Sequence, residues 1–193
     1  MAISARLKAS LDGAKVKYTA MKHPVVYTAQ EIAAAQHVPG RQLAKCVLVN
    51  TDRGPTLAVL PAVQLIDLKT LKALLKVKTL TIAKEADITQ RFPDVEVGAM
   101  SPFGNLYQVP VVVDRALGES DEVVFNAGSH TDTVKMRYRD MLGLIKPKTG
   151  SFGQPFGIPA PKRKAAGKRP ASSKKRPARS GHRTRTPAKR RRA

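Results

Sequence analysis

The chain has 193 residues, 42% of them hydrophobic, and a formal net charge of +21 from 35 Lys+Arg against 14 Asp+Glu, with a single cysteine. This length predicts one globular domain with a small extra module, and one cysteine excludes a disulfide framework and a Cys-rich zinc site. The first residues lack the apolar run of a signal peptide, and no segment approaches the roughly 20 apolar residues of a membrane span, so we expect a soluble cytoplasmic protein without a membrane partner.

The positive charge is concentrated near the C-terminus. Residues 1–147 hold 19 Lys+Arg and all 14 Asp+Glu, whereas residues 148–193 hold the other 16 Lys+Arg and no acid. A segment with so many like charges and so few apolar residues cannot offset the entropy that it would lose on folding. We therefore predict a globular domain at 1–147, a Pro/Gly linker at 148–161 and a disordered basic tail at 162–193.

Hydrophobic spacing and capping residues predict alternating helices and strands in the first 147 residues. In chain order, helices are expected at 3–13, 29–35, 68–75, 84–92 and 139–145, and strands at 25–27, 43–49, 56–60, 79–82, 109–113, 122–125 and 134–137. Thr28 and Glu31 have capping-box spacing, Asp67 is an N-cap, and Asp52-Arg53-Gly54 is a hairpin turn signal. Short strands, joined mostly by hairpins and interrupted by helices, indicate a mixed α/β (α+β) fold with a largely antiparallel sheet of about seven strands.

Several enzyme classes lack their motifs in this chain. The sequence contains no phosphate-binding G-x-x-x-x-G-K-[ST] or G-x-G-x-x-G loop, no G-x-S-x-G nucleophile elbow and no H-E-x-x-H zinc motif. The four histidines are too scattered to indicate a metal site, and we expect no cofactor. Cys46 is a candidate nucleophile, but it lies in an apolar strand, where a buried core cysteine is the more common role. Strand alternation places its side chain and that of Lys45 on opposite faces.

Three other features carry candidate functional residues. Lys45 interrupts the apolar run of residues 43–49, where an inward ammonium is costly and an edge lysine facing solvent is the alternative. Residues 98–104 form a glycine-bracketed loop, which either brings backbone N–H groups close to a ligand or is an ordinary turn. Residues 126–131 form a small polar segment directly after an apolar strand, in which His130 is either functional or a capping or surface histidine.

In this order and spacing, the three features together resemble the YbaK/prolyl-tRNA synthetase insertion-domain family of aminoacyl-tRNA deacylases. The resemblance rests on Ala44-Lys45, on Gly98-x-x-x-Pro102-Phe103-Gly104 and on Phe125-Asn126-Ala127-Gly128-Ser129-His130, with support from Tyr27-Thr28-Ala29-Gln30-Glu31 and Leu57-Ala58-Val59-Leu60-Pro61. It spans residues 3–147 and implies a mixed sheet curled into an open barrel with flanking helices. It also implies hydrolysis of the ester of a mischarged tRNA, most typically proline tRNA carrying alanine or cysteine.

The resemblance implies roles for particular residues. Lys45 is the essential lysine and holds the terminal phosphate or the acyl carbonyl, while backbone groups around Gly98 bind the ester carbonyl or the developing oxyanion. His130 is a candidate general base, and the alternative is a water held by the loops and a ribose hydroxyl of the substrate. The implied substrate-binding residues are Tyr27, Ser101, Pro102, Phe103, Gly104, Asn126 and Gly128.

Two positions bear on the identity of the acyl group. Cys46 stands where the family typically has a small polar residue, and a thiol there either alters which acyl group fits or simply packs. The run Met100-Ser101-Pro102-Phe103-Gly104 resembles the alanine-editing branch more than the cysteine-editing branch. The expected substrate is therefore alanyl-tRNA(Pro), followed by cysteinyl-tRNA(Pro).

The basic tail repeats short Pro/Ala/Lys/Arg units that resemble the tails of linker histones and bacterial histone-like proteins. Such a chain binds polyanions without sequence choice and with steep salt dependence. The residues expected to contact nucleic acid are Lys162, Arg163, Lys164, Lys168, Arg169, Lys174, Lys175, Arg176, Lys189, Arg190, Arg191 and Arg192. The expected partner is mischarged tRNA, with prolyl-tRNA synthetase and DNA as further candidates. The alternative function is a nucleoid- or chromatin-associated DNA-binding protein that uses a degenerate editing domain as an interaction module.

Overall fold

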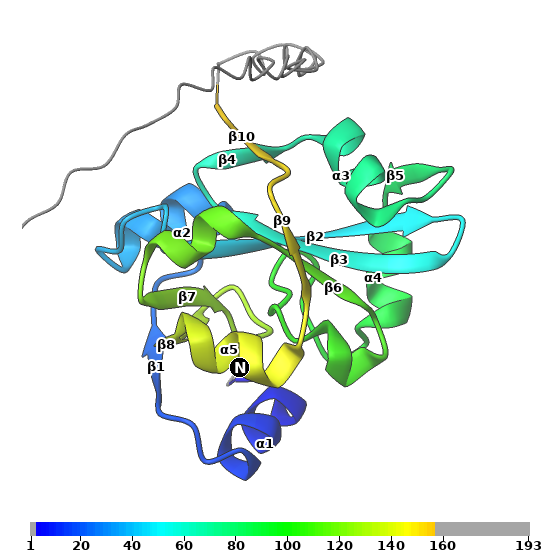
Figure 1. Ribbon diagram of the computed structural model, residues 1–193. Helices are drawn as coiled ribbons and strands as arrows, with labels where there is room; N and C mark the ends of the chain where they lie inside the picture. The colour runs from blue at the N-terminus through cyan, green and yellow to red at the C-terminus, as the bar shows by residue number, and fades with distance from the viewer. Residues whose placement is uncertain (1–2, 157–193) are drawn as a thin grey trace, which may run out of the picture. The chain divides into compact units, whose positions relative to one another are not determined.

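A computed structural model describes residues 3–156 of the chain (Figure 1). The α-helices are α1 (Ala5–Gly13), α2 (Ala29–Ala35), α3 (Leu68–Leu75), α4 (Glu85–Arg91) and α5 (Tyr138–Ile145), and two 3₁₀ helices span Gly104–Tyr107 and Arg115–Glu119. The strands are β1 (Tyr18–Lys22), β2 (Leu43–Thr51), β3 (Gly54–Pro61), β4 (Gln64–Ile66), β5 (Leu80–Ile82), β6 (Val111–Asp114), β7 (Glu122–Asn126), β8 (Asp132–Arg137), β9 (Lys148–Gly150) and β10 (Gly153–Pro155). None of the helices within residues 3–156 is both long and apolar enough to cross a membrane. The tail residues predicted to bind nucleic acid lie outside the described residues.

Eight of the strands form one mixed sheet. Seven follow the order β1-β8-β7-β2-β3-β6-β9, β5 pairs with β2 beside this path, and β10 and β4 form a separate two-stranded sheet. Five of the eight strand pairs are antiparallel, and the pairs β2–β7, β3–β6 and β6–β9 are parallel. The predicted mixed α/β, largely antiparallel fold is confirmed, with ten strands in the described residues in place of about seven.

Two helices begin at the caps that the sequence predicts. The Thr28 side chain accepts a hydrogen bond from the N–H of Glu31 at 3.2 Å, and the Glu31 carboxylate accepts one from the N–H of Thr28 at 2.9 Å, so α2 starts with a complete capping box. Asp67 accepts from the N–H groups of Lys69 and Thr70 and starts α3. The first of these caps fixes the residue that precedes it, Tyr27, at the start of α2.

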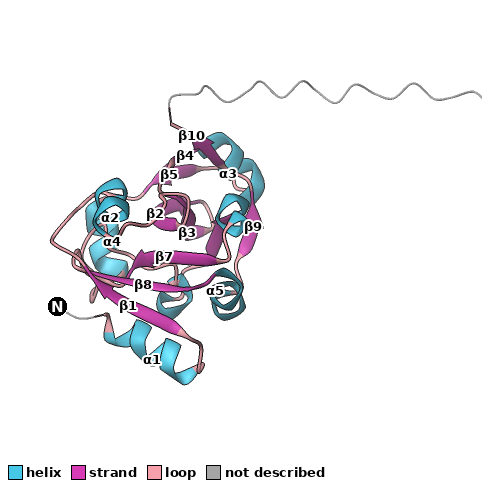
Figure 2. Cartoon of the chain, turned by 90° about the vertical axis from the view of Figure 1, so that its left-hand side faces the viewer, coloured by secondary structure: helices cyan, strands magenta, loops and turns pink. Residues whose placement is uncertain are grey.

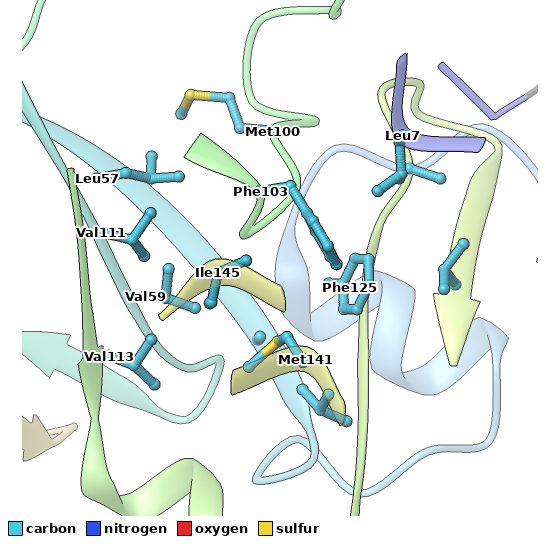
Figure 3. Packing of buried hydrophobic residues seen from close by; sticks show 14 of the residues in the cluster. Leu7, Leu57, Val59, Met100, Phe103, Val111, Val113, Phe125, Met141 and Ile145 are labelled. Atoms are coloured by element: carbon cyan, nitrogen blue, oxygen red, sulfur yellow. The ribbon is translucent and has the colours of Figure 1, made fainter. Parts of the chain in front are cut away.

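The sheet is buried on both faces. Along β3, Leu57 and Val59 belong to the main core cluster, whereas Ala58 and Leu60 belong to a second cluster that includes Leu71 of α3. Helices α1 and α5 lie beside the sheet (Figure 2), and their side chains Leu7, Met141 and Ile145 belong to the main cluster (Figure 3). Because neighbouring side chains of a strand point to opposite faces, Lys45 on β2 shares the α3 side with Val47 and Val49, and Cys46 points toward the main core.

The first strand differs from the prediction. Residues 25–27 form no strand, and Tyr18–Lys22 instead forms β1, which pairs antiparallel with β8 at the edge of the sheet. Buried and exposed residues do not alternate along β1, so the hydrophobic pattern of the sequence does not indicate a strand there. Backbone pairing with β8 holds β1 in the sheet. The N–H of Val26 donates to the carbonyl of His130 at 3.4 Å, which places residues 25–27 beside the polar segment after β7.

The beginning of the predicted linker also differs. Residues 148–155 form β9, which pairs with β6, and β10, which pairs with β4. Between them Phe152 is 1% exposed, and one carboxylate oxygen of Asp114 accepts hydrogen bonds from the N–H groups of Phe152 and Gly153 at 2.6 Å each. The Pro/Gly content of residues 148–155 predicts a linker, whereas one buried aromatic and one buried carboxylate fix these residues to the domain.

We expect Phe152→Ala to destabilise the domain by about 3–5 kcal/mol, because it empties a fully buried aromatic site. Urea unfolding of the full chain, followed by circular dichroism, measures the change. Phe156→Ala is the matched control, since Phe156 is 49% exposed and its removal should change the free energy of unfolding by about 0.5 kcal/mol or less. Equal effects of the two substitutions would contradict the assignment of residues 148–155 to the folded domain.

Candidate active site

Lys45 lies on an interior strand and is half-buried. Its Nζ donates a hydrogen bond to the backbone carbonyl of Gln64 on β4 and lies 5.3 Å from the centroid of the Phe156 ring. Lys45 is therefore not an edge-strand lysine that faces solvent, which was the alternative. Burial lowers the pKa of the Lys45 ammonium, since the charged form is less well solvated than in water.

A small pocket opens beside Lys45 because β2 has no neighbouring strand there. On this side β2 pairs with β7 only at Leu43 and Ala44 and with β5 only at Val49–Thr51. The pocket has a volume of about 40 Å³. Its lining residues are Tyr27, Ala29, Ile32, Leu43, Ala44, Lys45, Cys46, Gly98 and Asn126. Four residues predicted for the site, each from a separate segment of the sequence, thus line one pocket: Tyr27, Lys45, Gly98 and Asn126.

Gly98 and Asn126 form the polar wall of the pocket. Gly98 has φ +92°, a conformation that favours glycine, and its carbonyl accepts a hydrogen bond from Nδ2 of Asn126 at 3.4 Å. The other amide atom of Asn126, Oδ1, is buried and has no hydrogen-bond partner among the described residues. A buried acceptor without a partner is costly, so Oδ1 is available to a donor group of a ligand.

His130 lies behind this wall and is not one of the lining residues. Its Nε2 is 3.0 Å from the carbonyl oxygen of Val97, and its ring packs on Tyr27 with centroids 4.8 Å apart. Because a carbonyl only accepts, Nε2 carries the proton in this contact, and Nδ1 is buried without a partner among the described residues. A methyl group added to Gly98 would lie 3.4 Å from the His130 ring. The ring therefore supports both Tyr27 and Gly98.

The loop residues Ser101, Pro102, Phe103 and Gly104 are buried and are not among the residues that line the pocket. Phe103 is 0% exposed and packs against Phe125 with ring centroids 5.7 Å apart. A Cβ on Gly104 would lie 2.8 Å from the carbonyl oxygen of Val109, closer than packing allows. Phe103 belongs to the main core cluster, against which Cys46 of the pocket lining also packs. Gly104 is glycine because the backbone passes so close.

Gly128 is also placed away from the pocket. It has φ +106°, and a Cβ there would lie 3.0 Å from Cβ of Ser4. Its N–H donates to the carbonyl of Ala99, and its carbonyl accepts from the N–H of Glu96 at 2.9 Å. Gly128 thus joins the N-terminal segment, the 96–99 loop and the segment after β7.

Sequence analysis missed three residues beside the pocket. The carboxylate of Glu96 accepts a hydrogen bond from the N–H of His130 at 2.8 Å and holds the two loops together. Gln64 provides the carbonyl acceptor for Lys45, and Phe156 provides the ring near its ammonium. Glu96 is an acid two residues before Gly98, which is a weak local signal, whereas Gln64 and Phe156 have no local signal at all.

Cys46 lines the pocket and packs against the main core. Burial raises the pKa of its thiol well above the ordinary value, because the thiolate would lose its hydration. The thiol therefore stays protonated at neutral pH and is a poor nucleophile.

The chemistry available in this pocket follows from its lining. It offers one ammonium at Lys45, one free amide oxygen at Asn126 and the backbone of Gly98, surrounded by apolar side chains. The lining contains no carboxylate and no imidazole. Such a site can bind a small polar group, stabilise negative charge on it and exclude larger groups, while the nucleophile comes from water or from the substrate.

A second cavity, of about 470 Å³, lies at the other end of β7 and β8. It is lined by Gly118, Ser120, Asp121, Glu122, Arg137, Tyr138 and Arg139. None of the residues predicted for the site lines it, so size alone does not identify the functional site.

We expect Lys45 to lose its proton at a lower pH than the other lysines, because burial disfavours its ammonium. The group is charged below its pKa, so as the pH rises its positive charge is lost earlier than that of a fully exposed lysine. An NMR titration of the lysine Cε and Nζ signals measures this, with the Lys45 signal assigned by its absence in Lys45→Ala. A Lys45 signal that titrates together with the other lysines would contradict the half-buried position.

Comparison with known proteins identifies the family of the chain. Residues 23–144 match the family described as the aminoacyl-tRNA editing domain. The prolyl-tRNA editing protein ProX of Acetoanaerobium sticklandii is 31% identical over 150 residues, which cover 75% of this chain and 91% of that protein. The residues 23–144 that match the family include every residue of the pocket lining.

Solved structures show the same fold at lower sequence identity. A candidate trans-editing enzyme for prolyl tRNA synthetase superimposes with a TM-score of 0.69 at 19% identity and covers 78% of this chain and 96% of that one. A hypothetical protein superimposes with a TM-score of 0.71 at 16% identity and covers 77% and 99% of the two chains. The resemblance to the YbaK/prolyl-tRNA synthetase insertion-domain family is confirmed: the chain belongs to the aminoacyl-tRNA editing domain family and is an aminoacyl-tRNA deacylase.

Proposed function

We propose that this deacylase acts in trans on proline tRNA that carries alanine and, less readily, cysteine. The observation that carries the proposal is the small pocket beside the Lys45 ammonium, whose volume of about 40 Å³ suits a small acyl group. A pocket separates acyl groups that differ by one methylene by only about 1–3 kcal/mol, so a second hydrolytic site is useful for small side chains. The relative from Acetoanaerobium sticklandii, named a prolyl-tRNA editing protein, supports the same tRNA.

Lys45 in this proposal binds the acyl carbonyl rather than the terminal phosphate. Its Nζ is half-buried among mostly apolar lining residues, where a charged phosphate would have to give up much of its hydration. As the nucleophile adds, negative charge develops on the carbonyl oxygen, and an ammonium placed there stabilises it. Asn126 Oδ1 accepts a hydrogen bond from the amino group of the aminoacyl ester, which fixes the acyl group against Gly98.

The nucleophile in this proposal is a water molecule held by the loops and a ribose hydroxyl of the substrate. The lining contains no carboxylate, and the Cys46 thiol is protonated. Water adds to the ester carbonyl, and the bond to the ribose oxygen then breaks, which gives the free amino acid and the 3′-terminal hydroxyl. An aminoacyl ester is already labile, so positioning and charge stabilisation are sufficient. His130 acts as a positioning residue for Tyr27 and Gly98, since its ring packs against both and is not part of the pocket lining.

The basic tail in this proposal binds the body of the tRNA. Residues 157–193 hold 15 Lys+Arg and no acid. An editing domain contacts mainly the acceptor end, so phosphate contacts by the tail would raise the rate of association and the affinity without affecting the chemical step.

Deacylation of one proline tRNA charged with alanine or with cysteine tests the proposed acyl group. We expect kcat/KM for the alanyl ester to exceed that for the cysteinyl ester. A preference for the cysteinyl ester would reverse the proposed order. Competition between proline tRNA and duplex DNA for the full chain tests the alternative of a DNA-packaging protein: that alternative gains support only if DNA displaces tRNA and no ester is hydrolysed.

A further inference from the structure

The exposed aromatic side chains of the described residues both lie beside Lys45. All nine aromatic residues of the chain fall within residues 3–156, and seven of them are buried or half-buried. The two exposed ones are Tyr27, at 71%, and Phe156, at 49%. Tyr27 lines the pocket and packs on His130, whereas the ring of Phe156 lies 5.3 Å from Nζ of Lys45. Exposed aromatic rings confined to one site indicate a surface that binds a ligand.

Three successive interactions of residues 152–155 place Phe156 beside Lys45. Phe152 is buried in the cluster that also contains Leu71 of α3, on the face of the sheet toward which Lys45 points. The Asp114 carboxylate holds the N–H groups of Phe152 and Gly153. β10 then pairs with β4, with Pro155 opposite Gln64, whose carbonyl accepts the hydrogen bond from Lys45 (Figure 1). Phe156 follows directly, so its place beside the ammonium is set by strand pairing.

The chemistry of Phe156 fits an unpaired nucleobase. An ammonium within about 6 Å of a ring centroid is attracted to the ring, which helps to hold the Lys45 side chain in place. About half of the side chain remains exposed, and an exposed ring is a surface on which a base of single-stranded nucleic acid can stack, whatever its identity. The acceptor end of a tRNA is single-stranded next to the ester that an editing enzyme cleaves.

We propose that Phe156 is a substrate-positioning residue, on which an unpaired base of the tRNA 3′ end stacks while the ester enters the Lys45 pocket. The inference rests on the proposed function, because it assumes that an aminoacyl ester occupies that pocket. It assigns the segment just before the basic tail to the active site, which the family match to residues 23–144 does not include. The Gln64 carbonyl also holds Lys45, so loss of the ring should affect binding of the substrate more than the chemical step.

Kinetics of three Phe156 variants on two substrates test the inference. The substrates are alanyl-tRNA(Pro) and the alanyl ester of the trinucleotide CCA, which lacks the tRNA body. We expect Phe156→Ala and Phe156→Leu to raise KM about tenfold on both substrates, with kcat within about twofold of the parent, because neither side chain can stack. Phe156→Trp should restore the parental KM. Ile82→Ala, which removes another exposed apolar side chain (54% exposed), should change neither constant.

The outcomes separate this inference from the proposed function. If the parent chain hydrolyses the alanyl ester and Phe156→Ala leaves KM unchanged, the inference is wrong and the proposed function stands. The inference is equally wrong if Phe156→Leu behaves like the parent, or if the loss occurs with intact tRNA but not with the trinucleotide. If the parent chain hydrolyses no ester, the proposed function fails, and the inference fails with it.

Discussion

Replacing Lys45 by methionine should lower kcat/KM for alanyl-tRNA(Pro) by about 10²–10³-fold, which is the typical effect of removing one group that stabilises the developing oxyanion. Methionine keeps an unbranched apolar side chain, so the half-buried position stays filled and the substitution removes mainly the charge. The loss should appear chiefly in kcat, because the charge that Lys45 stabilises develops on the carbonyl only as the nucleophile adds. Single-turnover and steady-state deacylation measure the two constants.

Lys69→Met is the matched control, since Lys69 is an exposed lysine on α3 and is not among the residues that line the pocket. It should leave both constants within about twofold of the parent. Unfolding in urea checks that the two variants are equally well folded. A Lys45→Met variant that keeps more than a third of the parental kcat/KM would show that the ammonium is not part of the catalytic machinery.

Removal of residues 157–193 should raise KM for alanyl-tRNA(Pro) by about tenfold or more at low salt, with little change in kcat. The truncation removes 15 Lys+Arg and no acid, so it removes phosphate contacts while the pocket around Lys45 remains complete. The dependence of log KM on log salt concentration should become shallower, because fewer counterions are released on binding. Deacylation assays across a range of salt concentrations measure both effects.

The position of the cut decides what this experiment tests. Truncation at residue 150 would also remove Phe152, β10 and Phe156, and would combine loss of stability, loss of the active-site aromatic and loss of charge. A full-length variant with glutamine in place of every Lys and Arg after residue 156 is the control for chain length. If the truncated chain keeps the parental KM at about 0.15 M salt, the tail does not serve tRNA binding.

Local sequence signals predict those parts of the fold whose causes are local. The Thr28–Glu31 capping box and the Asp67 cap involve groups within three residues of one another, and both helices begin where these residues indicate. By contrast, β10 depends on partners far apart in the sequence. The Phe152 side chain is buried in the domain, and its N–H donates a hydrogen bond to Asp114, 38 residues earlier in the chain. No short window of the sequence contains both partners, so the composition of this segment predicts a linker in place of a strand.

Local sequence signals likewise cannot tell which of the predicted site residues face the pocket. Tyr27, Lys45, Gly98 and Asn126 line one pocket, as their common assignment to the site implies. Gly104 and Gly128 belong to the same motifs, yet Gly104 is glycine because Val109 lies against it, and Gly128 because of its positive φ and the nearby Ser4. A glycine that faces a ligand and a glycine that faces another backbone are identical in a sequence, and their surroundings distinguish them only in three dimensions.

The most direct test of the account is the ratio of kcat/KM for alanyl-tRNA(Pro) to that for correctly charged prolyl-tRNA(Pro), measured with the full chain and the same tRNA preparation. The small pocket beside Lys45 predicts a ratio of about 10² or more in favour of the alanyl ester. Equal hydrolysis of the two esters, or hydrolysis of neither, would contradict the proposal that this chain edits proline tRNA.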